Sequence, residues 1–160
     1  MNCRGFSMIE MLVVLSIVAI LGTLATMNWN RMSIKTTVEG QIRTVHADLM
    51  RIRLEALYGK RERRVKFAGT EFRVYSTNVE TTSPIEAKNF KYPFSTTTGD
   101  FVFNTSGMAN GTAGSVCIDP FGTLAQKSDA SVDSLVISAG RVSLGKRTGE
   151  ECKSEHIEKK

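Results

Sequence analysis

The side chain with the clearest chemical consequence is Glu10, a carboxylate inside a long apolar run. From Phe6 to Ala25 the sequence carries no other charge, and Arg4 and Gly5 stand just ahead of it. Placing a carboxylate in the middle of a membrane-spanning helix costs roughly 2.5–3.5 kcal/mol on insertion scales. A charge retained at that cost normally has a partner, so the partner of Glu10 is expected to indicate the function.

The element that must position Glu10 is predicted to be a membrane-spanning helix. As an α-helix, residues 6–27 rise by roughly 33 Å, and a hydrocarbon core is about 30 Å thick. Arg4 is the charge in the short leader, so the positive-inside rule places the N-terminus in the cytoplasm and residues 28–160 across the membrane. If such helices pack against one another, Glu10 would need a positive group on a neighbouring helix, and such a pair would fix the axial register between the two helices.

This N-terminus resembles the class III signal of type IV pilins and pseudopilins. The matching residues are Gly5-Phe6-Ser7-Met8-Ile9-Glu10-Met11-Leu12-Val13-Val14. The resemblance implies that prepilin peptidase cuts between Gly5 and Phe6 and methylates the new amine of Phe6. Glu10 then occupies the acidic position of the family near the start of the mature chain.

Two other interpretations of the N-terminus stay open. An ordinary secretory signal has an apolar core of about 7–15 residues and a small-residue cleavage site after it. Here the apolar stretch is longer, contains an acid near its start, and is not followed by a clear A-x-A site. The second alternative is a generic single-pass anchor in which Glu10 is accidental.

The cysteines fit an oxidising compartment. Cys3 lies in the leader, so Cys117 and Cys152 remain in the processed chain. In the periplasm a disulfide between them is expected, with two thiols as the alternative. Together with His46 and His156 they make a poor zinc constellation, so neither a metal nor a cofactor is predicted. The sequence also lacks the G-x-S-x-G, H-E-x-x-H and P-loop patterns, so we do not expect an enzyme.

Beyond the membrane the helix is predicted to continue through residues 28–59. Apolar residues recur there at spacings of four and three, which indicates one buried stripe on an amphipathic helix that ends at Gly59. The stripe consists of Val38, Ile42, Val45, Leu49, Ile52 and Ala56. The helix is expected to run unbroken from Phe6 to Tyr58.

From Arg64 the apolar period changes to two, which predicts an antiparallel β domain over residues 60–148. The expected strands are 64–68, 71–76, 101–103, 116–118, 135–137 and 142–144, and residues 77–87 are expected to form a loop or an irregular edge of the sheet. The charged tail, residues 149–160, is expected to be mobile. A chain of 160 residues with a net charge of +5 fits one small domain behind a leader of residues 1–5 and an anchor of residues 6–27.

The β region is similar to the GspH/FimT branch of minor pseudopilins. The resemblance rests on Phe101-Val-Phe-Asn-Thr-Ser-Gly107, Val116-Cys-Ile118 and Leu135-Val-Ile-Ser-Ala-Gly-Arg-Val142. It implies an α+β, pilin-like fold in which a long N-terminal helix, half membrane-spanning and half amphipathic, packs on an antiparallel β-sheet domain.

Some members of that branch bind DNA, and they carry a Gly-Arg-x-Arg pattern near the C-terminus. Here the match is Gly140-Arg141-Val142-Ser143, so the second arginine is missing and Lys146 and Arg147 are its nearest substitutes. A second basic group follows the helix and would contact DNA phosphates or an acidic partner, or else form a solvated turn. It consists of Lys60, Arg61, Arg63 and Arg64.

The function implied by both resemblances is assembly rather than catalysis. The chain is expected to be a minor pilin or pseudopilin that primes or caps a type IV pilus or a type II secretion pseudopilus. The alternative is a DNA-binding minor pilin for DNA uptake. The implied partners are membrane lipid before assembly, prepilin peptidase, the inner-membrane assembly platform and other pilin or pseudopilin subunits. The implied location is the bacterial inner membrane, followed by a periplasmic or surface filament.

Overall fold

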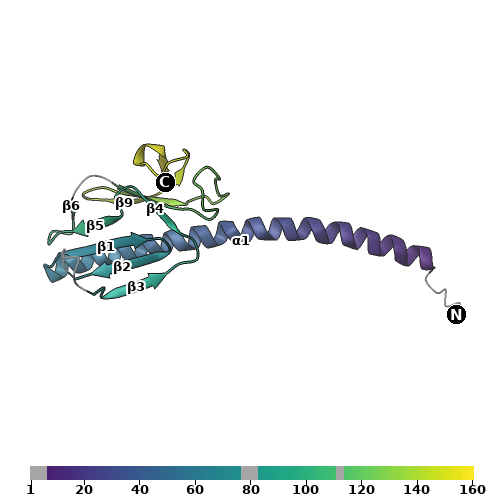
Figure 1. Cartoon of the computed structure of the whole chain (residues 1–160), viewed down its shortest axis with the longest axis horizontal. Coiled ribbons are helices and arrows are strands. Elements are labelled where there is room, and N and C mark those ends of the chain that lie inside the picture. Colours follow the sequence, from purple (N-terminus) through teal and green to yellow (C-terminus); the bar gives the residue numbers. More distant parts are fainter. Residues whose placement is uncertain (1–6, 77–82, 111–113) are drawn as a thin grey trace. The chain divides into compact units, whose positions relative to one another are not determined.

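The structure, a computed structural model, describes residues 7–76, 83–110 and 114–160, except for the side chains of residues 24–27. The chain divides into two units, residues 1–33 and residues 34–160. The first unit contains the N-terminal part of a single helix. The second contains the rest of that helix together with all of the strands (Figure 1).

Helix α1 spans Met8–Gly59 and is 52 residues long. It contains no proline to break its hydrogen bonds, and Glu10 lies in its first turn, where a negative charge complements the helix dipole. The helix ends at Gly59, and the next residue, Lys60, has a φ of 49° that no helix residue adopts. The prediction of one unbroken helix is therefore confirmed over the residues that the structure describes.

The second part of α1 buries the predicted apolar stripe. All six of its side chains are completely buried in one core with both sheets, and residues such as Phe72, Phe103 and Leu135 contribute to the same core. Tertiary packing of this face, rather than helix propensity alone, stabilises the helix in residues 34–59.

In the described parts of the chain, ten strands form two five-stranded antiparallel sheets. The first sheet has the order β3-β2-β1-β5-β6. Its strands are β1 Arg63–Ala68, β2 Glu71–Tyr75, β3 Glu86–Asn89, β5 Asp100–Phe103 and β6 Ala109–Asn110. The second sheet has the order β10-β9-β8-β7-β4. Its strands are β4 Phe94–Thr96, β7 Gly114–Ile118, β8 Ser134–Ile137, β9 Val142–Arg147 and β10 Ile157–Lys159.

Aromatic side chains join the two sheets. Phe67 of β1 contacts Phe94 of β4 edge-to-face, with ring centroids 5.2 Å apart. Phe67 also packs edge-to-face on Phe72 and Phe101, both from the first sheet. Edge-to-face pairs of this kind contribute about 0.5–1.5 kcal/mol each beyond their buried area. Both sheets therefore share one core.

All the strands expected from the alternating patterns are present. Their observed ends differ from the predicted ends by at most two residues, except that β9 extends three residues beyond its predicted end. Four strands were not predicted, namely β3, β4, β6 and β10. The predicted fold, a long helix packed on an antiparallel β domain, is confirmed, and the strands of that domain divide into two sheets. Part of the predicted loop at 77–87 lies outside the described residues, and its last residues begin β3 instead.

The C-terminal tail is ordered, so the expectation of a mobile tail is wrong. It contains a 3₁₀ turn, Ser154–His156, and then β10, which pairs with β9 through Ile157 and Arg147. A Cβ at Gly145 of β9 would lie 2.3 Å from Ile157 Cγ2, so only glycine allows this close approach. The tail covers the face of β7 and β8 that points away from α1, which explains why every residue of those two strands is buried.

Candidate functional site

Glu10 lies among exposed apolar side chains in the first part of α1. Every large apolar side chain from Met8 to Leu21 is between 49% and 90% exposed in this single chain. Glu10 is exposed as well, and no side chain within residues 7–76, 83–110 and 114–160 pairs with its carboxylate. Within the described residues, the predicted site thus presents one acid on an exposed apolar helix, and its carboxylate has no partner there.

The hydroxyl groups of the same segment are satisfied locally. Ser16 Oγ donates to the carbonyl oxygen of Leu12 over 2.8 Å, and Thr23 Oγ1 donates to that of Ile20 over 2.8 Å. Such bonds to the preceding turn let hydroxyls enter an apolar environment without an unpaired donor. Glu10 differs from them, because none of the described residues provides its carboxylate with a partner.

The helix is long and apolar enough to cross a membrane. An 18-residue window within Met8–Gly59 has a mean hydropathy of 2.4, and none of it is buried. Gly5 and Phe6, the predicted cleavage and methylation residues, lie outside the described residues.

Cys117 and Cys152 form the predicted disulfide, which links β7 to the tail. The hydroxyl of Ser115 donates to the carbonyl oxygen of Cys152 over 2.6 Å, and Thr97 Oγ1 donates to the same oxygen over 3.0 Å. Val136 and Ile157 complete a small second apolar cluster around the two cysteines. The covalent bond and the cluster together hold the tail on the second sheet.

The basic residues after α1 separate into two groups. Lys60 and Arg61 are exposed. Arg63 instead lies 3.7 Å from a Glu55 carboxylate oxygen, and Arg64 Nε donates to Asp100 over 2.8 Å. The two arginines are largely covered and help to attach β1 to α1 and β5, so half of the predicted basic group is engaged within the domain.

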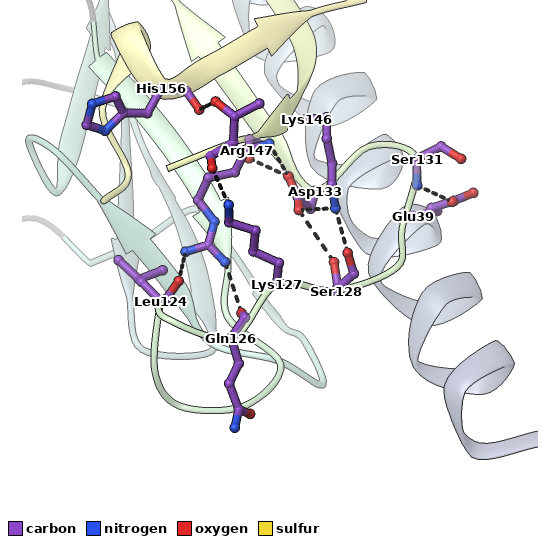
Figure 2. Close-up of polar contacts among 12 residues, drawn as sticks. Glu39, Leu124, Gln126, Lys127, Ser128, Ser131, Asp133, Lys146, Arg147 and His156 are labelled. Atoms are coloured by element: carbon purple, nitrogen blue, oxygen red, sulfur yellow. Dashed lines mark hydrogen bonds and ion pairs between the residues drawn. The ribbon is translucent and has the colours of Figure 1, made fainter. Parts of the chain in front are cut away.

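Lys146 and Arg147 are held inside the domain and do not form an exposed substitute for the missing arginine (Figure 2). Arg147 is 1% exposed and donates through Nη1 to the Leu124 carbonyl over 2.8 Å and through Nη2 to the Gln126 carbonyl over 3.3 Å. Lys146 Nζ lies 2.8 Å from a carboxylate oxygen of Asp133.

Asp133 is the centre of this cluster and was missed by sequence reasoning. Its side chain is 1% exposed and accepts hydrogen bonds from the Lys146 ammonium, the Arg147 amide and the Ser134 hydroxyl (Figure 2). A buried charge with this many partners is satisfied. The cluster fixes the long β7–β8 connection against β9, so it has a structural role.

Of the predicted C-terminal basic residues, only Arg141 is exposed, in the turn between β8 and β9. The Ala109 amide donates to the Ala139 carbonyl over 2.9 Å, which places this turn beside β6. Seven basic residues were predicted to contact DNA or an acidic partner. Three of them are exposed, namely Lys60, Arg61 and Arg141. The alternative function of DNA binding gains no support from this arrangement.

The same β7–β8 connection also contacts α1. The amide of Ser131 donates to Glu39 Oε1 over 2.7 Å (Figure 2). This hydrogen bond to the charged form lowers the pKa of Glu39 below its usual value, and the nearby cations Lys35 and Arg43 act in the same direction.

A row of ion pairs attaches the edge strand β3 to α1. Arg51 lies 2.6 Å from Glu55 and 2.6 Å from Glu86, and Lys88 lies 2.7 Å from the largely buried Asp48. The hydrogen bond from Arg51 lowers the pKa of Glu86, and the bond to Asp48 raises the pKa of Lys88. Of the helix charges in this row, Asp48 and Arg51 therefore pair with residues of β3, whereas Glu55 lies between Arg51 and Arg63 of β1.

His46 and His156 lie in separate places. His46 Nε2 lies 3.4 Å from the carbonyl oxygen of Val142, and His156 lies in the tail, where its carbonyl accepts from Thr148. Within the described parts of the chain, no group of three or more His, Cys, Asp or Glu side chains is arranged to hold a metal ion.

A second apolar face of α1 was also missed. Ala47, Met50, Leu54 and Tyr58 form the outer face of α1, and they are exposed although they recur at the spacing of a buried stripe. The signal was available in the sequence, because these residues repeat at intervals of three and four, as the core residues do. What the sequence does not reveal is which of the two series the sheets cover.

Comparisons with known proteins found a sequence motif at the N-terminus and structural similarity over most of the chain. Residues 1–26 match the family model described as the prokaryotic N-terminal methylation motif. No curated protein matches the chain. Among solved structures, the chain resembles the type IV minor pilin FimU of Pseudomonas aeruginosa, with 17% sequence identity, a TM-score of 0.58, and coverage of 78% of this chain and 98% of that one.

A second resemblance is to the minor pseudopilin EpsH from the type 2 secretion system of Vibrio cholerae. It has 11% sequence identity, a TM-score of 0.51, and coverage of 69% of this chain and 97% of that one. The chain therefore has the fold of the minor pilins and pseudopilins, and it carries the N-terminal methylation motif.

Proposed function

We propose that this chain is a minor pilin or pseudopilin, a structural subunit that primes or caps a filament of such subunits. The observation that carries the proposal is the exposed apolar helix with Glu10 near its start, joined to a domain with the minor pilin fold. A helix that exposes apolar side chains on all sides requires either lipid or other helices around it. A filament subunit has lipid before assembly and other helices afterwards.

Maturation is proposed to follow the N-terminal motif. Prepilin peptidase removes residues 1–5 and methylates the new amine on Phe6. The match of residues 1–26 to the methylation motif supports this step. Removing the leader would place the new amine of Phe6 four residues before Glu10, the first acid of the mature chain.

Glu10 is proposed to pair with the N-terminal amine of a neighbouring subunit. Once the helices leave lipid and pack together, an unpaired carboxylate among apolar side chains is strongly unfavourable. An amine brought alongside removes that cost only at one axial offset between two helices. The pair therefore selects register, which is the best-attested use of a polar group in an apolar helix interface.

The proposed location follows from the same helix. The subunit waits in the bacterial inner membrane with its N-terminus in the cytoplasm and residues 28–160 in the periplasm, and the inner-membrane assembly platform then moves it into the filament. The disulfide between Cys117 and Cys152 supports this orientation, because such bonds persist in the oxidising periplasm.

The first test is the intact mass of the protein purified from its native membrane, followed by fragmentation of its N-terminus. A chain that begins at N-methylated Phe6 is expected. A chain that begins near residue 26 would instead mean an ordinary secretory signal and a soluble periplasmic domain, and it would overturn the proposal.

A variant sharpens the assignment of the cleavage site. Gly5→Ala is expected to leave the leader uncut and to keep the protein out of filaments, because the peptidase reads the glycine before the scissile bond. Gly22→Ala, at a glycine of α1 with open space at its Cβ position, is the matched control and should be processed normally. A Gly5→Ala chain still shortened at Phe6 would contradict the assignment.

A further inference from the structure

A short polar segment, residues 28–31, directly follows the apolar run of α1. Residues 11–27 carry no charge, and the next four residues are Asn28, Trp29, Asn30 and Arg31. All four side chains are exposed, and that of Trp29 is 75% exposed. Trp29 belongs to neither apolar cluster of the described residues, so packing of the domain does not explain a tryptophan at this position.

The side chains of segment 28–31 point to all sides of the helix. Successive helical residues are rotated by about 100°, so Trp29 and Arg31 lie on nearly opposite sides. A protein partner packs against one side of a helix, whereas lipid headgroups surround a spanning helix on every side at one depth. The arrangement therefore favours headgroups, rather than a protein, as the surroundings of this segment.

The residue types of the segment also suit the headgroup region. Tryptophan is enriched at the boundary between membrane and water, because its ring is largely apolar while its N–H needs a polar partner. The guanidinium of Arg31 suits phosphate oxygens. The acid nearest to Arg31 in the sequence is Glu39, eight residues further on, and it accepts the hydrogen bond from the Ser131 amide.

The spacing between Glu10 and Trp29 matches the thickness of a bilayer. Both residues belong to α1 and to the same unit of the chain. From residue 10 to residue 29 the helix rises by about 28 Å, and a hydrocarbon core is about 30 Å thick. When Trp29 lies among the headgroups of one leaflet, Glu10 therefore lies at the headgroup level of the other leaflet. The cost of a carboxylate is largest at the bilayer centre, so this position keeps Glu10 away from the costly depth.

We propose that segment 28–31 binds the phospholipid headgroups of the periplasmic leaflet and thereby holds Glu10 at the headgroup level of the cytoplasmic leaflet until assembly. The inference rests on the proposed function, because it requires α1 to span the inner membrane before the subunit enters a filament. It adds the lipid contact and the depth at which the helix is held. Interfacial tryptophan and arginine side chains are the groups that fix the position of a spanning helix.

The sequence contains one tryptophan, so fluorescence reports the depth of Trp29 directly. The processed full chain is reconstituted into vesicles of phosphatidylethanolamine and phosphatidylglycerol. These vesicles contain lipids brominated either close to the headgroup or near the ends of the acyl chains. We expect Trp29 to be quenched most by the bromines close to the headgroup. Strongest quenching near the acyl-chain ends, or none by either lipid, would overturn the inference.

A fluorophore on a single introduced cysteine measures the depth of the other end of the helix. The leader cysteine is removed by processing and the other two cysteines are joined in the disulfide, so Met11→Cys and Ile20→Cys each provide one thiol for labelling. Both positions are exposed. We expect the label at position 11 to be quenched most by the bromines close to the headgroup. The label at position 20, the matched control midway along the apolar run, should be quenched most near the acyl-chain ends. The reverse result at either position would overturn the inference.

Replacing both interfacial side chains tests whether they set the depth. In Trp29→Leu/Arg31→Leu the first charge after the apolar run is Lys35, four residues beyond Arg31, so the helix should shift by up to about 6 Å. The label at position 20 should then leave the bilayer centre, and its quenching near the acyl-chain ends should fall. Trp29→Tyr/Arg31→Lys keeps a polar aromatic ring and a cation and should give the wild-type depths. Unchanged depths in the leucine variant would mean that apolar length alone positions the helix, and would overturn the inference.

The same measurements separate this inference from the proposed function. If the chain begins at N-methylated Phe6 and enters filaments but Trp29 lies near the bilayer centre, the proposed function stands and the inference fails. If the purified chain begins near residue 26, the spanning helix has been removed, and the proposed function and this inference both fail.

Discussion

Two parts of helix α1 share one backbone conformation and differ in what surrounds their side chains. Every described side chain from Ser7 to Met32 is exposed, whereas residues 34–59 bury a stripe of six apolar side chains against the sheets. The first part has apolar residues on all sides and one acid. The second has apolar residues on two opposite faces with charges between them.

The difference shows that the two parts of the helix are stabilised by different surroundings. The second part owes its helical state to packing within its own domain. The first part has no such packing and depends on lipid or on the helices of neighbours. Substitutions in the first part should therefore affect assembly and leave the domain folded, and substitutions on the core stripe should do the reverse.

Glu10→Ala should give the largest effect of this comparison. It removes one partner of the ion pair proposed to be buried in the filament, which would cost about 3–5 kcal/mol, or more than a hundredfold in an association constant. Processing at Phe6 should be normal, and incorporation into sheared filaments, measured by immunoblotting, should be almost lost. Glu39→Ala, in the second part of α1, is the matched control. Normal incorporation of Glu10→Ala would remove the register account.

The disulfide provides the opposite case, a large effect confined to the domain. Cys117 and Cys152 are 35 residues apart, and closing a loop of that length stabilises the folded state by about 4 kcal/mol in the chain-entropy model. Replacing both with alanine should lower the free energy of unfolding by about that amount, as measured by urea denaturation of the full chain in detergent. The wild-type protein under reducing conditions is the control and should behave similarly. A loss below about 1 kcal/mol would mean that the apolar cluster alone holds the tail.

A pair of leucines tests the comparison directly. Leu49 is completely buried, and Leu12 is 65% exposed. Leu49→Ala should cost roughly 3 kcal/mol of domain stability, because buried leucines lose about 2–5 kcal/mol on truncation. Leu12→Ala should change the same quantity by less than about 0.5 kcal/mol. Equal losses in urea denaturation would show that the two parts of the helix do not differ as described.

The features predicted from the sequence are those with strong local signals. The core stripe of α1 and the hairpin of β1 and β2 follow from periodicities of 3.6 and 2, which a short window of sequence is enough to show. The pairing of Cys117 with Cys152 was predicted because disulfides form in the oxidising periplasm and these are the two cysteines that remain once the leader is removed. In each case the information lies within a few residues or in a small set of residue types.

The features that were missed depend on distant contacts. Arg147 looks like a surface cation in sequence, but it is buried because Leu124 and Gln126 supply carbonyl oxygens from the β7–β8 connection. The tail looks mobile because it is charged, yet Ile157 and Cys152 fix it to the second sheet. β10 and β4 are three residues long and are defined by pairing with neighbours rather than by their own composition.

The smallest expected effect comes from Glu39, whose carboxylate joins α1 to the β7–β8 connection. Glu39→Ala removes the acceptor for the Ser131 amide and should cost about 1 kcal/mol or less at pH 7, since a single exposed hydrogen bond contributes little. Glu39→Gln keeps an acceptor oxygen and should lose less. Glu150→Ala, at an exposed glutamate of the tail, is the control for the change in net charge.

The pH dependence identifies the charged form of Glu39 as the cause. Its folded-state pKa is lowered, mainly by the hydrogen bond from the Ser131 amide, so the unfolded chain binds the proton more tightly. The stabilisation is therefore fully present above the unfolded pKa of about 4.3 and is lost as the pH falls through the lower folded pKa. In urea denaturation, wild type and Glu39→Gln should differ by a constant amount from pH 7 to about pH 5.5 and converge below about pH 4. A difference that persists at pH 3 would mean that the contact depends on the shape of the side chain rather than on its charge, and that this end of α1 is held by packing alone.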